Sequence, residues 1–561
     1  MKSSLKRLFA VSLAVLMAVS AAACTQSAPS STPAASTPAA STPAASGDSA
    51  SADSDAPVYP LDTDVKLTWW MPMASNYTTY ATNFAEIEFA KNFHAAVGID
   101  VEYVQPPIGK EQEQFNIMVA SGDLTDIIEQ RWTTEYPGGS MGAISDGIIL
   151  DITDLIAEHA PNYTAYLAER PSFVKEVVTD EGRHYCFPFV RGSAKLKTTS
   201  GPILRKDWLD DLGLEIPVTI ADWENVLTQF KDQKGATAPF FGQAANQDPS
   251  QLYNTFLGAY GVRTDFFVDT DNDTIKYGYI EPGFKDFLIT MNDWANKGLL
   301  DPNFLSADRA AMDAAILNGA AGAVYGPGGG GLGPWITTAR EADASTTFDL
   351  AATTFPVLNA GDPIKYAGTS YDYAITSRGS AAITTKCKEV EVAVKVLDYA
   401  YSEEGNILYN FGVEGESFTF VDGVPTYTEL VTANPNGLNF AQALSNYTRA
   451  NVSGPFEQHE QYIIQFYAMD QQKDALDKWT TQDPMNMYTL EPPISMTPEE
   501  SSEITKLIAD INTYRREMVA KFLTGAESLD KFDDFVAQMN ALGAQRCIEI
   551  HQAAYDRYIQ R

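Results

Sequence analysis

The chain has 561 residues and a formal net charge of -34, with 73 acidic and 39 basic side chains. This acidity argues strongly against nucleic acid as a partner and weakly against a polyanionic ligand, although a cleft in an acidic protein can be locally basic. Hydrophobic residues make up 45% of the chain, which is enough for large cores, and the length predicts at least two lobes.

Residues 1–23 are typical of an export signal. Lys2, Lys6 and Arg7 form a basic start, and the apolar run that follows, residues 8–19, is too short to span a membrane. Three alanines then stand directly before Cys24, which resembles the bacterial lipobox, whose cysteine receives a diacylglyceryl group. We therefore expect lipid attachment at Cys24 and an extracytoplasmic protein anchored to the cell membrane. The alternative is an ordinary cleaved signal that leaves Cys24 removed or unmodified.

The next segment, residues 24–57, contains almost nothing that could form a core. The unit Ser-Thr-Pro-Ala-Ala repeats three times from Ser31 to Ala45, and such a composition is typical of disorder. Its proline content makes the segment semi-extended. We expect a tether that holds a folded body away from a membrane.

The folded body begins near Leu61 with strands and helices in alternation. Strands are expected over residues 65–70, 99–104 and 126–130, with helices over residues 84–96 and 111–120 between them. Strands separated by helices of this length are typical of a parallel α/β sheet.

Two later helices carry explicit start and stop signals. Thr219 begins one, and Gly235 ends it. The other begins with a capping box at Thr497, has proline in its first turn, and ends at Gly525. The apolar stripes of such helices predict core packing and not a cofactor site.

Two segments resemble ligand-binding loops but lack residues that such loops require. The glycine-rich run Gly326–Gly333 lacks the Gly-Lys-Ser/Thr ending of a phosphate-binding loop, so we expect a flexible loop near a cleft. Asp269, Asp271 and Asp273 are spaced as at the start of a calcium loop, but Thr274 stands where glycine is required, which favours a polar hairpin turn. The sequence predicts no cofactor and no metal, and it contains no local hydrolase signature.

Short segments in a fixed order resemble one protein family. The segment Ala120-Ser-Gly-Asp-Leu-Thr-Asp-Ile-Ile128 looks like an early segment of that family, with Thr125 where proline is common. The others that follow in order include Tyr136–Gly139, Ala160–Tyr163, Arg205–Leu209, Gly258–Gly261, Lys297–Pro302, Leu397–Gly405 and Asn410–Ser417. The collinear stretch covers about residues 65–440 and resembles extracellular solute-binding protein family 1, in particular its long lipoprotein branch, which is associated with uptake of complex carbohydrates.

The resemblance implies an α/β, periplasmic-binding-protein-like fold of two lobes, with a hinge and an interlobe ligand cleft. We expect a first lobe of residues 61–186 plus 314–373, and a second lobe of residues 187–313 plus 374–561 with a helical C-terminal segment. The resemblance further implies a monomeric, non-enzymatic substrate-binding protein that captures a sugar or oligosaccharide and delivers it to the permease subunits of an ABC importer.

Two alternatives remain open at this stage. A surface polysaccharide hydrolase or lyase is one, because 73 carboxylates allow two to meet across a cleft at glycosidase spacing. A peptide-binding or sensory binding protein is the other.

A sugar site needs aromatic platforms beside polar and charged side chains, and ligands of open α/β sheets lie beyond the carboxyl ends of strands. These criteria select Trp70, Arg131 and Trp132. Aromatic and polar residues in expected loops, at the start of a helix or beside glycines complete the candidates: Arg205, Trp208, Tyr260, Trp335, Tyr371 and Asp372. For each tryptophan the alternative is burial in a core.

Overall fold

The computed structural model describes residues 57–78, 80–245, 247–364, 379–481, 488–490 and 492–561. The expected export signal, the lipid attachment site Cys24 and nearly all of the expected tether lie outside these residues, as do the candidates Tyr371 and Asp372. Within the described ranges, no helix combines the length and the apolar character needed to cross a membrane.

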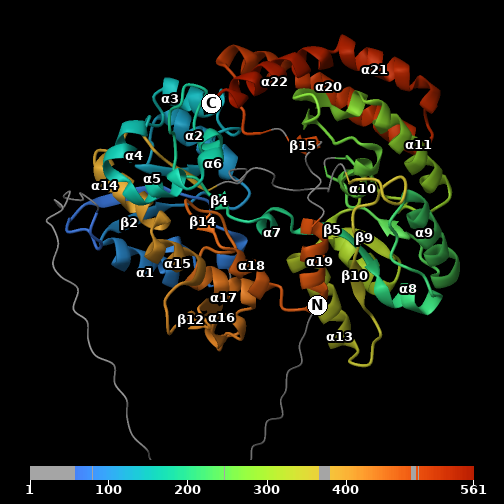
Figure 1. The fold of residues 1–561 in the computed structure, drawn as a ribbon, viewed down its shortest axis with the longest axis horizontal. Helices are drawn as coiled ribbons and strands as arrows, with labels where there is room; N and C mark the ends of the chain where they lie inside the picture. The colour runs from blue at the N-terminus through green and yellow to red at the C-terminus, as the bar shows by residue number, and fades with distance from the viewer. Residues whose placement is uncertain (1–56, 79, 246, 365–378, 482–487, 491) are drawn as a thin grey trace, which may run out of the picture. The chain divides into compact units, whose positions relative to one another are not determined.

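Helices and short strands alternate along the chain (Figure 1). The strands are β1 Lys66–Trp70, β2 Asp100–Val104, β3 Ile127–Gln130, β4 Val190–Arg191, β5 Ser200–Arg205, β6 Phe240–Phe241, β7 Phe266–Asp269, β8 Thr274–Tyr277, β9 Ala323–Pro327, β10 Leu350–Ala352, β11 Ser380–Ile383, β12 Phe418–Val421, β13 Val424–Tyr427, β14 Glu457–Gln458 and β15 Tyr488–Leu490. The α-helices are α1 Glu88–Val97, α2 Glu111–Ser121, α3 Gly139–Ser145, α4 Thr153–His159, α5 Pro161–Ala168, α6 Pro171–Val177, α7 Ala194–Lys197, α8 Lys206–Leu212, α9 Ile220–Lys234, α10 Ser250–Phe256, α11 Pro282–Asn296, α12 Arg309–Asn318, α13 Gly333–Ala342, α14 Val390–Asp398, α15 Glu403–Phe411, α16 Glu429–Thr432, α17 Phe440–Tyr447, α18 Glu460–Phe466, α19 Asp470–Thr481, α20 Pro498–Thr524, α21 Phe532–Ala541 and α22 Ala544–Ile559.

The first sheet has the strand order β11-β3-β1-β2. The three strands expected from the N-terminal part of the body pair in parallel, as predicted, and β11 joins β3 in the antiparallel direction. α1 and α2, which connect the three strands, each end at a glycine with positive φ (78° at Gly98, 70° at Gly122), a conformation that other residues adopt only with strain. The expected parallel pairing of these three strands is therefore confirmed, and β11 adds an antiparallel strand at the edge of the sheet.

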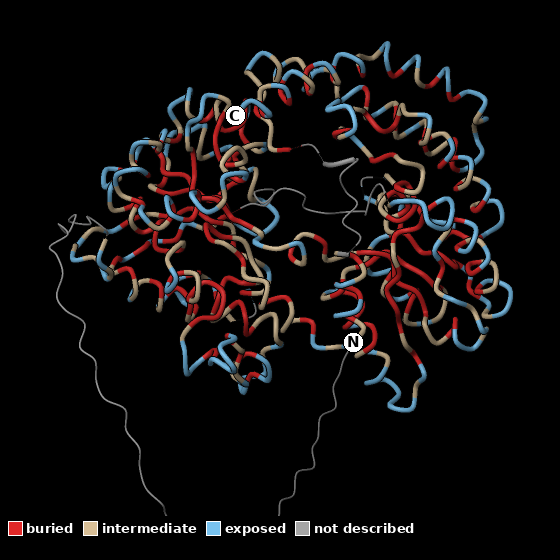
Figure 2. Tube along the Cα trace, viewed as in Figure 1, coloured by how far each residue is buried: buried red, intermediate tan, exposed pale blue. Residues whose placement is uncertain are grey.

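The second sheet has the order β10-β5-β9-β6 and is mixed. β9 is antiparallel to β5 and parallel to β6, and β10 is antiparallel to β5. Each sheet lies within a hydrophobic core of its own (Figure 2). We call the residues around the first sheet the first lobe, and those around the second sheet the second lobe.

The chain divides between the lobes differently from the expected partition. Residues 314–364 were expected in the first lobe, but β9 and β10 pair with β5 in the second sheet. Conversely, β11 follows residue 374 and belongs to the first sheet, where α14 and α15 add Val394, Leu397 and Tyr409 to the core of that lobe. The chain therefore stays in the second lobe until it has passed β10, and it is back in the first lobe at β11. It enters the second lobe again between α18 and α19, and Trp479 of α19 lies in the core of the second lobe.

The capped helices form as expected. Thr219 and Asp222 make a capping box at the start of α9, and Thr497 and Glu500 make another at the start of α20. α20 packs against α11 of the second lobe, and α22 packs against α20 (Figure 1). The C-terminal helices thus extend the second lobe.

Two further expectations about turns have different outcomes. The aspartates at positions 269, 271 and 273 lie at the turn of the antiparallel β7–β8 hairpin, as predicted, and no group of three or more potential metal ligands occurs among the described residues. The glycine-rich run Gly326–Gly333 is not a flexible loop. It includes the end of β9 and a wide helical turn over Gly328–Leu332 that leads directly into α13.

Candidate functional site

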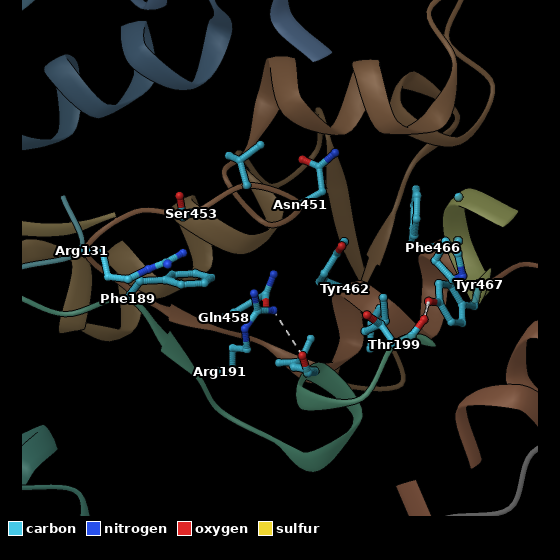
Figure 3. Close-up of a pocket in the computed structure, with 16 residues that line it drawn as sticks. Arg131, Phe189, Arg191, Thr199, Asn451, Ser453, Gln458, Tyr462, Phe466 and Tyr467 are labelled. Carbon is cyan, nitrogen blue, oxygen red and sulfur yellow. Dashed lines mark hydrogen bonds between the residues drawn. The ribbon is translucent and has the colours of Figure 1, made fainter. Parts of the chain in front are cut away.

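Segments that cross between the lobes meet at a cavity of about 500 Å³, which we call the hinge pocket (Figure 3). The first lobe contributes Arg131, which follows β3, and residues of β14 and α18. The crossing from β4 to β5 contributes residues of β4 and α7, and the second lobe contributes the turn after β9. The side chains that line the pocket include those of Phe189, Arg191, Gln458, Tyr462, Phe466 and Tyr467.

The crossing is held in place by a short ladder. β4 lies on the chain as it leaves the first lobe, and β14 lies just before α18, where the chain leaves that lobe again. The two strands pair in parallel, with Val190 opposite Glu457 and Arg191 opposite Gln458. This pairing brings residues about 270 positions apart to one wall of the pocket.

α18 supplies an aromatic wall. Tyr462 and Phe466 are four positions apart and so share one helix face, with ring centroids 6.0 Å apart and an interplanar angle of 29°. The helix begins at His459, whose Nδ1 accepts a hydrogen bond from the backbone N–H of Gln461 at 3.0 Å. Tyr467 follows directly. Burial raises the pKa of Tyr467 to about 12, so its hydroxyl stays protonated and donates to the carbonyl oxygen of Thr199 at 3.4 Å.

The glycine turn after β9 allows this wall to approach the second lobe. A Cβ atom on Gly328 would lie 2.8 Å from a ring carbon of Tyr467, and one on Gly329 would lie 2.8 Å from a ring carbon of Phe466. Any larger residue would displace the aromatic rings or the turn. The glycine run is therefore explained by close packing of the two lobes beside the pocket.

Polar groups complete the lining (Figure 3). The guanidinium group of Arg191 donates to the carbonyl oxygen of Leu196 at 3.2 Å and lies 5.5 Å from the ring centroid of Phe189. Gln458 is 5% exposed, and its Oε1 has no hydrogen-bond donor among the described residues. Nε of Arg131 is likewise buried without a partner in the described part of the chain. These groups can accept from and donate to a polar ligand.

Two further cavities adjoin the hinge pocket. One of about 400 Å³ is lined by the loop after β1, by Glu129 and by Arg449, and it shares Asn451, Val452 and Ser453 with the hinge pocket. We call it the Glu129 pocket. The other, of about 410 Å³, lies beside α22 and shares Arg131 with the hinge pocket. We call it the α22 pocket. The hinge pocket therefore shares lining residues with each of the other two cavities.

A buried ion pair lines the Glu129 pocket. Glu129 and Arg449 make two hydrogen bonds, of 2.8 and 2.9 Å, and their side chains are only 2% and 4% exposed. Burial raises the pKa of Glu129, and the charge of Arg449 opposes that shift. The pair joins the end of β3 to the segment that follows α17.

The two candidate tryptophans at strand ends lie in a core. Trp70 is 3% exposed and Trp132 is 1% exposed, and both rings pack on Phe115, with centroids 5.9 and 5.8 Å away. The indole N–H of Trp132 donates to the carbonyl oxygen of Ser380 at 3.2 Å. Neither ring lines the hinge pocket.

The candidates of the second lobe also make internal contacts. Arg205 pairs with Asp207 at 2.6 Å, and its guanidinium group lies 4.3 Å from the ring centroid of Trp208. The hydroxyl of Tyr260 donates to Oγ1 of Thr290 at 2.7 Å. The indole N–H of Trp335, which is 2% exposed, donates to a carboxylate oxygen of Asp313 at 2.8 Å.

Of the candidates within the described residues, Arg131 alone lines the hinge pocket, and the structure does not bring the others together there. The aromatic wall and the β4–β14 residues were missed. The spacing of Tyr462 and Phe466 was a usable signal, because aromatic residues at positions i and i+4 share one face of a helix.

Residues 78–407, more than half of the chain, match the family described as bacterial extracellular solute-binding protein. The fructooligosaccharide ABC transporter substrate-binding protein FusA of Streptococcus pneumoniae is 22% identical over 466 residues, which are 80% of this chain and 82% of FusA. The polygalacturonan/rhamnogalacturonan-binding protein YtcQ of Bacillus subtilis is 25% identical over 275 residues, 47% of this chain and 50% of YtcQ.

Solved structures agree in fold. The alginate-binding protein AlgQ2 superposes with a TM-score of 0.67 at 21% identity, over 90% of this chain and 100% of AlgQ2. An HMO-binding, ABC-transporter-associated solute-binding protein from Bifidobacterium longum infantis gives a TM-score of 0.70 at 18% identity, over 89% of this chain and 99% of that one. The fold is therefore the two-lobed, periplasmic-binding-protein-like fold, and the chain belongs to the family of bacterial extracellular solute-binding proteins.

Proposed function

We propose that this protein is the substrate-binding component of an ABC importer and that it binds an oligosaccharide in the hinge pocket. The observation that carries the proposal is the combination of an aromatic wall and unsatisfied polar groups at the crossing between two lobes. Tyr462 and Phe466 offer apolar surface to the face of a sugar ring. The side chains of Gln458 and Arg131, which line the pocket, offer polar groups to its substituents.

The series of cavities supports an oligosaccharide over a single sugar. The Glu129 pocket and the α22 pocket adjoin the hinge pocket on shared residues, so a chain of several rings can extend beyond it. Relatives named for fructooligosaccharide and polygalacturonan binding add support for this ligand class.

The family and the N-terminal sequence support a proposal for the location and the partners of the protein. We propose that the diacylglyceryl group on Cys24 anchors the protein outside the cytoplasm and that the ligand-bound form engages two permease subunits. Cys24→Ser should release the protein from the membrane fraction into the soluble fraction. Retention of the variant in membranes after a carbonate wash would refute the lipid anchor and leave the binding proposal intact.

A thermal-shift screen of the purified protein tests the binding proposal, because a ligand that prefers the folded state raises the melting temperature. The screen should include neutral and charged oligosaccharides, monosaccharides and peptides, with product analysis of every saccharide. We expect a shift with at least one oligosaccharide and no change in its chain length. New reducing ends or unsaturated products would favour a hydrolase or lyase, and a shift with peptides alone would favour a peptide-binding protein.

A further inference from the structure

The hinge pocket is positively charged although the chain as a whole is strongly acidic. Its lining contains the guanidinium groups of Arg131 and Arg191 and, among the described residues, no Asp or Glu. Because the chain has 73 acidic and 39 basic side chains, a lining of average composition would carry more carboxylates than basic groups. The positive charge is therefore a local property of this site.

Arg131 lacks the counter-charge that three fully buried arginines have. Arg205 pairs with Asp207, Arg449 with Glu129 and Arg515 with Asp248, all at 2.8 Å or less. For the half-buried side chain of Arg131 no carboxylate partner is found within the described ranges, and its Nε is buried without an acceptor. The half-buried side chain of Arg131 lines the cavity, so an anionic ligand bound there would supply the counter-charge that the described residues do not.

The position of Arg131 is also suited to a ligand group in the middle of a longer chain. It lines both the hinge pocket and the α22 pocket, and no Asp or Glu lines the described part of either cavity. The basic character continues into the crossing segment, since residues 182–206 contain six Lys or Arg and no Asp or Glu. The only carboxylate in the described lining of the adjoining Glu129 pocket is already paired with Arg449.

We propose that the oligosaccharide bound in the hinge pocket carries an anionic group, a carboxylate or a sulfate ester, which Arg131 binds while Arg191 supplies the second positive charge. This inference rests on the proposed function. A guanidinium group can donate two parallel hydrogen bonds to either anion, and such charge-assisted bonds are stronger than those to a neutral hydroxyl. The aromatic wall of α18 then contacts the apolar face of the sugar.

Calorimetric titration with three matched pairs of ligands tests the proposal: trigalacturonate and its methyl ester, sialyllactose and its methyl ester, and lactose 3'-sulfate and lactose. In at least one pair the acidic member should bind about tenfold or more tightly than its neutral counterpart, and the difference should shrink as salt is added. The pair in which this occurs distinguishes a carboxylate from a sulfate ester.

Arg131→Gln should remove most of that preference, whereas Arg131→Lys, which keeps the charge and loses the planar fork, should remove only part of it. Arg340→Gln is the matched control, because Arg340 is exposed on α13 and lines none of the three cavities. Melting temperatures of the variants show whether the fold is kept.

The outcomes separate this inference from the proposed function. Neutral oligosaccharides that bind as tightly as acidic ones, or an Arg131→Gln variant with unchanged preference, would overturn the anionic ligand and leave the oligosaccharide proposal standing. Binding of no saccharide in this panel or in the thermal-shift screen would overturn both.

Discussion

The buried pair Glu129–Arg449 allows a quantitative prediction about the first lobe. Glu129→Gln keeps the shape of the side chain and removes its charge. Arg449 then remains charged at 4% exposure, with one hydrogen bond to a neutral amide oxygen, its hydrogen bond to the carbonyl oxygen of Ser453, and a contact to the ring of Phe84 at 5.4 Å. Removal of one partner from a buried, bidentate pair costs about 3–5 kcal/mol, most of it from the uncompensated charge that stays behind. We expect a loss of that size in the free energy of unfolding.

Urea titration followed by tryptophan fluorescence, to which Trp69 in the core beside the pair contributes, measures this loss. The double variant Glu129→Met/Arg449→Met removes both charges, so it should recover at least half of the stability lost in the single variant. Arg546→Met is the matched control. It breaks an exposed pair with Glu503, whose members are 49% and 44% exposed, and should cost less than about 1 kcal/mol. A loss below about 1 kcal/mol in Glu129→Gln, or a double variant less stable than the single one, would refute the reasoning.

Three further predictions concern other parts of the protein. Burial raises the pKa of Asp398 to about 6. The stability that the protonated carboxyl contributes is therefore fully present below the unfolded pKa and is lost as the pH rises through about 6. Asp398→Asn has no carboxyl to titrate at this position. Between about pH 4.5 and 7.5, the native protein should therefore lose about 2 kcal/mol in free energy of unfolding relative to the variant, measured by urea titration. A carboxylate oxygen of Asp180 lies 2.6 Å from the guanidinium group of Arg561, and the side chain of Arg561 is 1% exposed. Because this ion pair holds the end of α22, Asp180→Ala should speed hydrogen exchange at the end of α22 and not in α21. Trp132→Ala should lower the free energy of unfolding by about 3–5 kcal/mol, because its ring is 1% exposed, and a variant as stable as the native protein would contradict this placement.

The parts of the fold that follow from local sequence were predictable. β1, β2 and β3 show alternating or continuous apolar patterns bounded by helices, and the caps at Thr219 and Thr497 use side chains within three residues of the bonds that they make. The division into lobes depends instead on pairing between distant segments. β11 pairs with β3 across about 250 residues, and nothing in the short run Ser380–Ile383 specifies that partner.

In the candidate site, too, local sequence patterns could not identify residues that come together from distant segments. Trp70 and Trp132 satisfied the rule that ligands lie beyond strand ends, but both rings turn into a core around Phe115. The hinge pocket depends on β4 and β14, which have two residues each and pair across the crossing. Strands of that length carry no periodic signal, so the residues that they bring together could not be identified without the structure.

The central claim is that the aromatic wall of α18 binds a saccharide. Its most direct test is calorimetric titration of Phe466→Ala with the oligosaccharide that gives the largest thermal shift. Phe420→Ala is the control, because Phe420 is the same residue type and is 46% exposed on the β12–β13 hairpin outside the pocket.

The account predicts that Phe466→Ala weakens binding by about five- to thirtyfold with little change in melting temperature, whereas Phe420→Ala binds as the native protein does. Equal affinities of Phe466→Ala and the native protein would contradict the assignment of the hinge pocket as the ligand site.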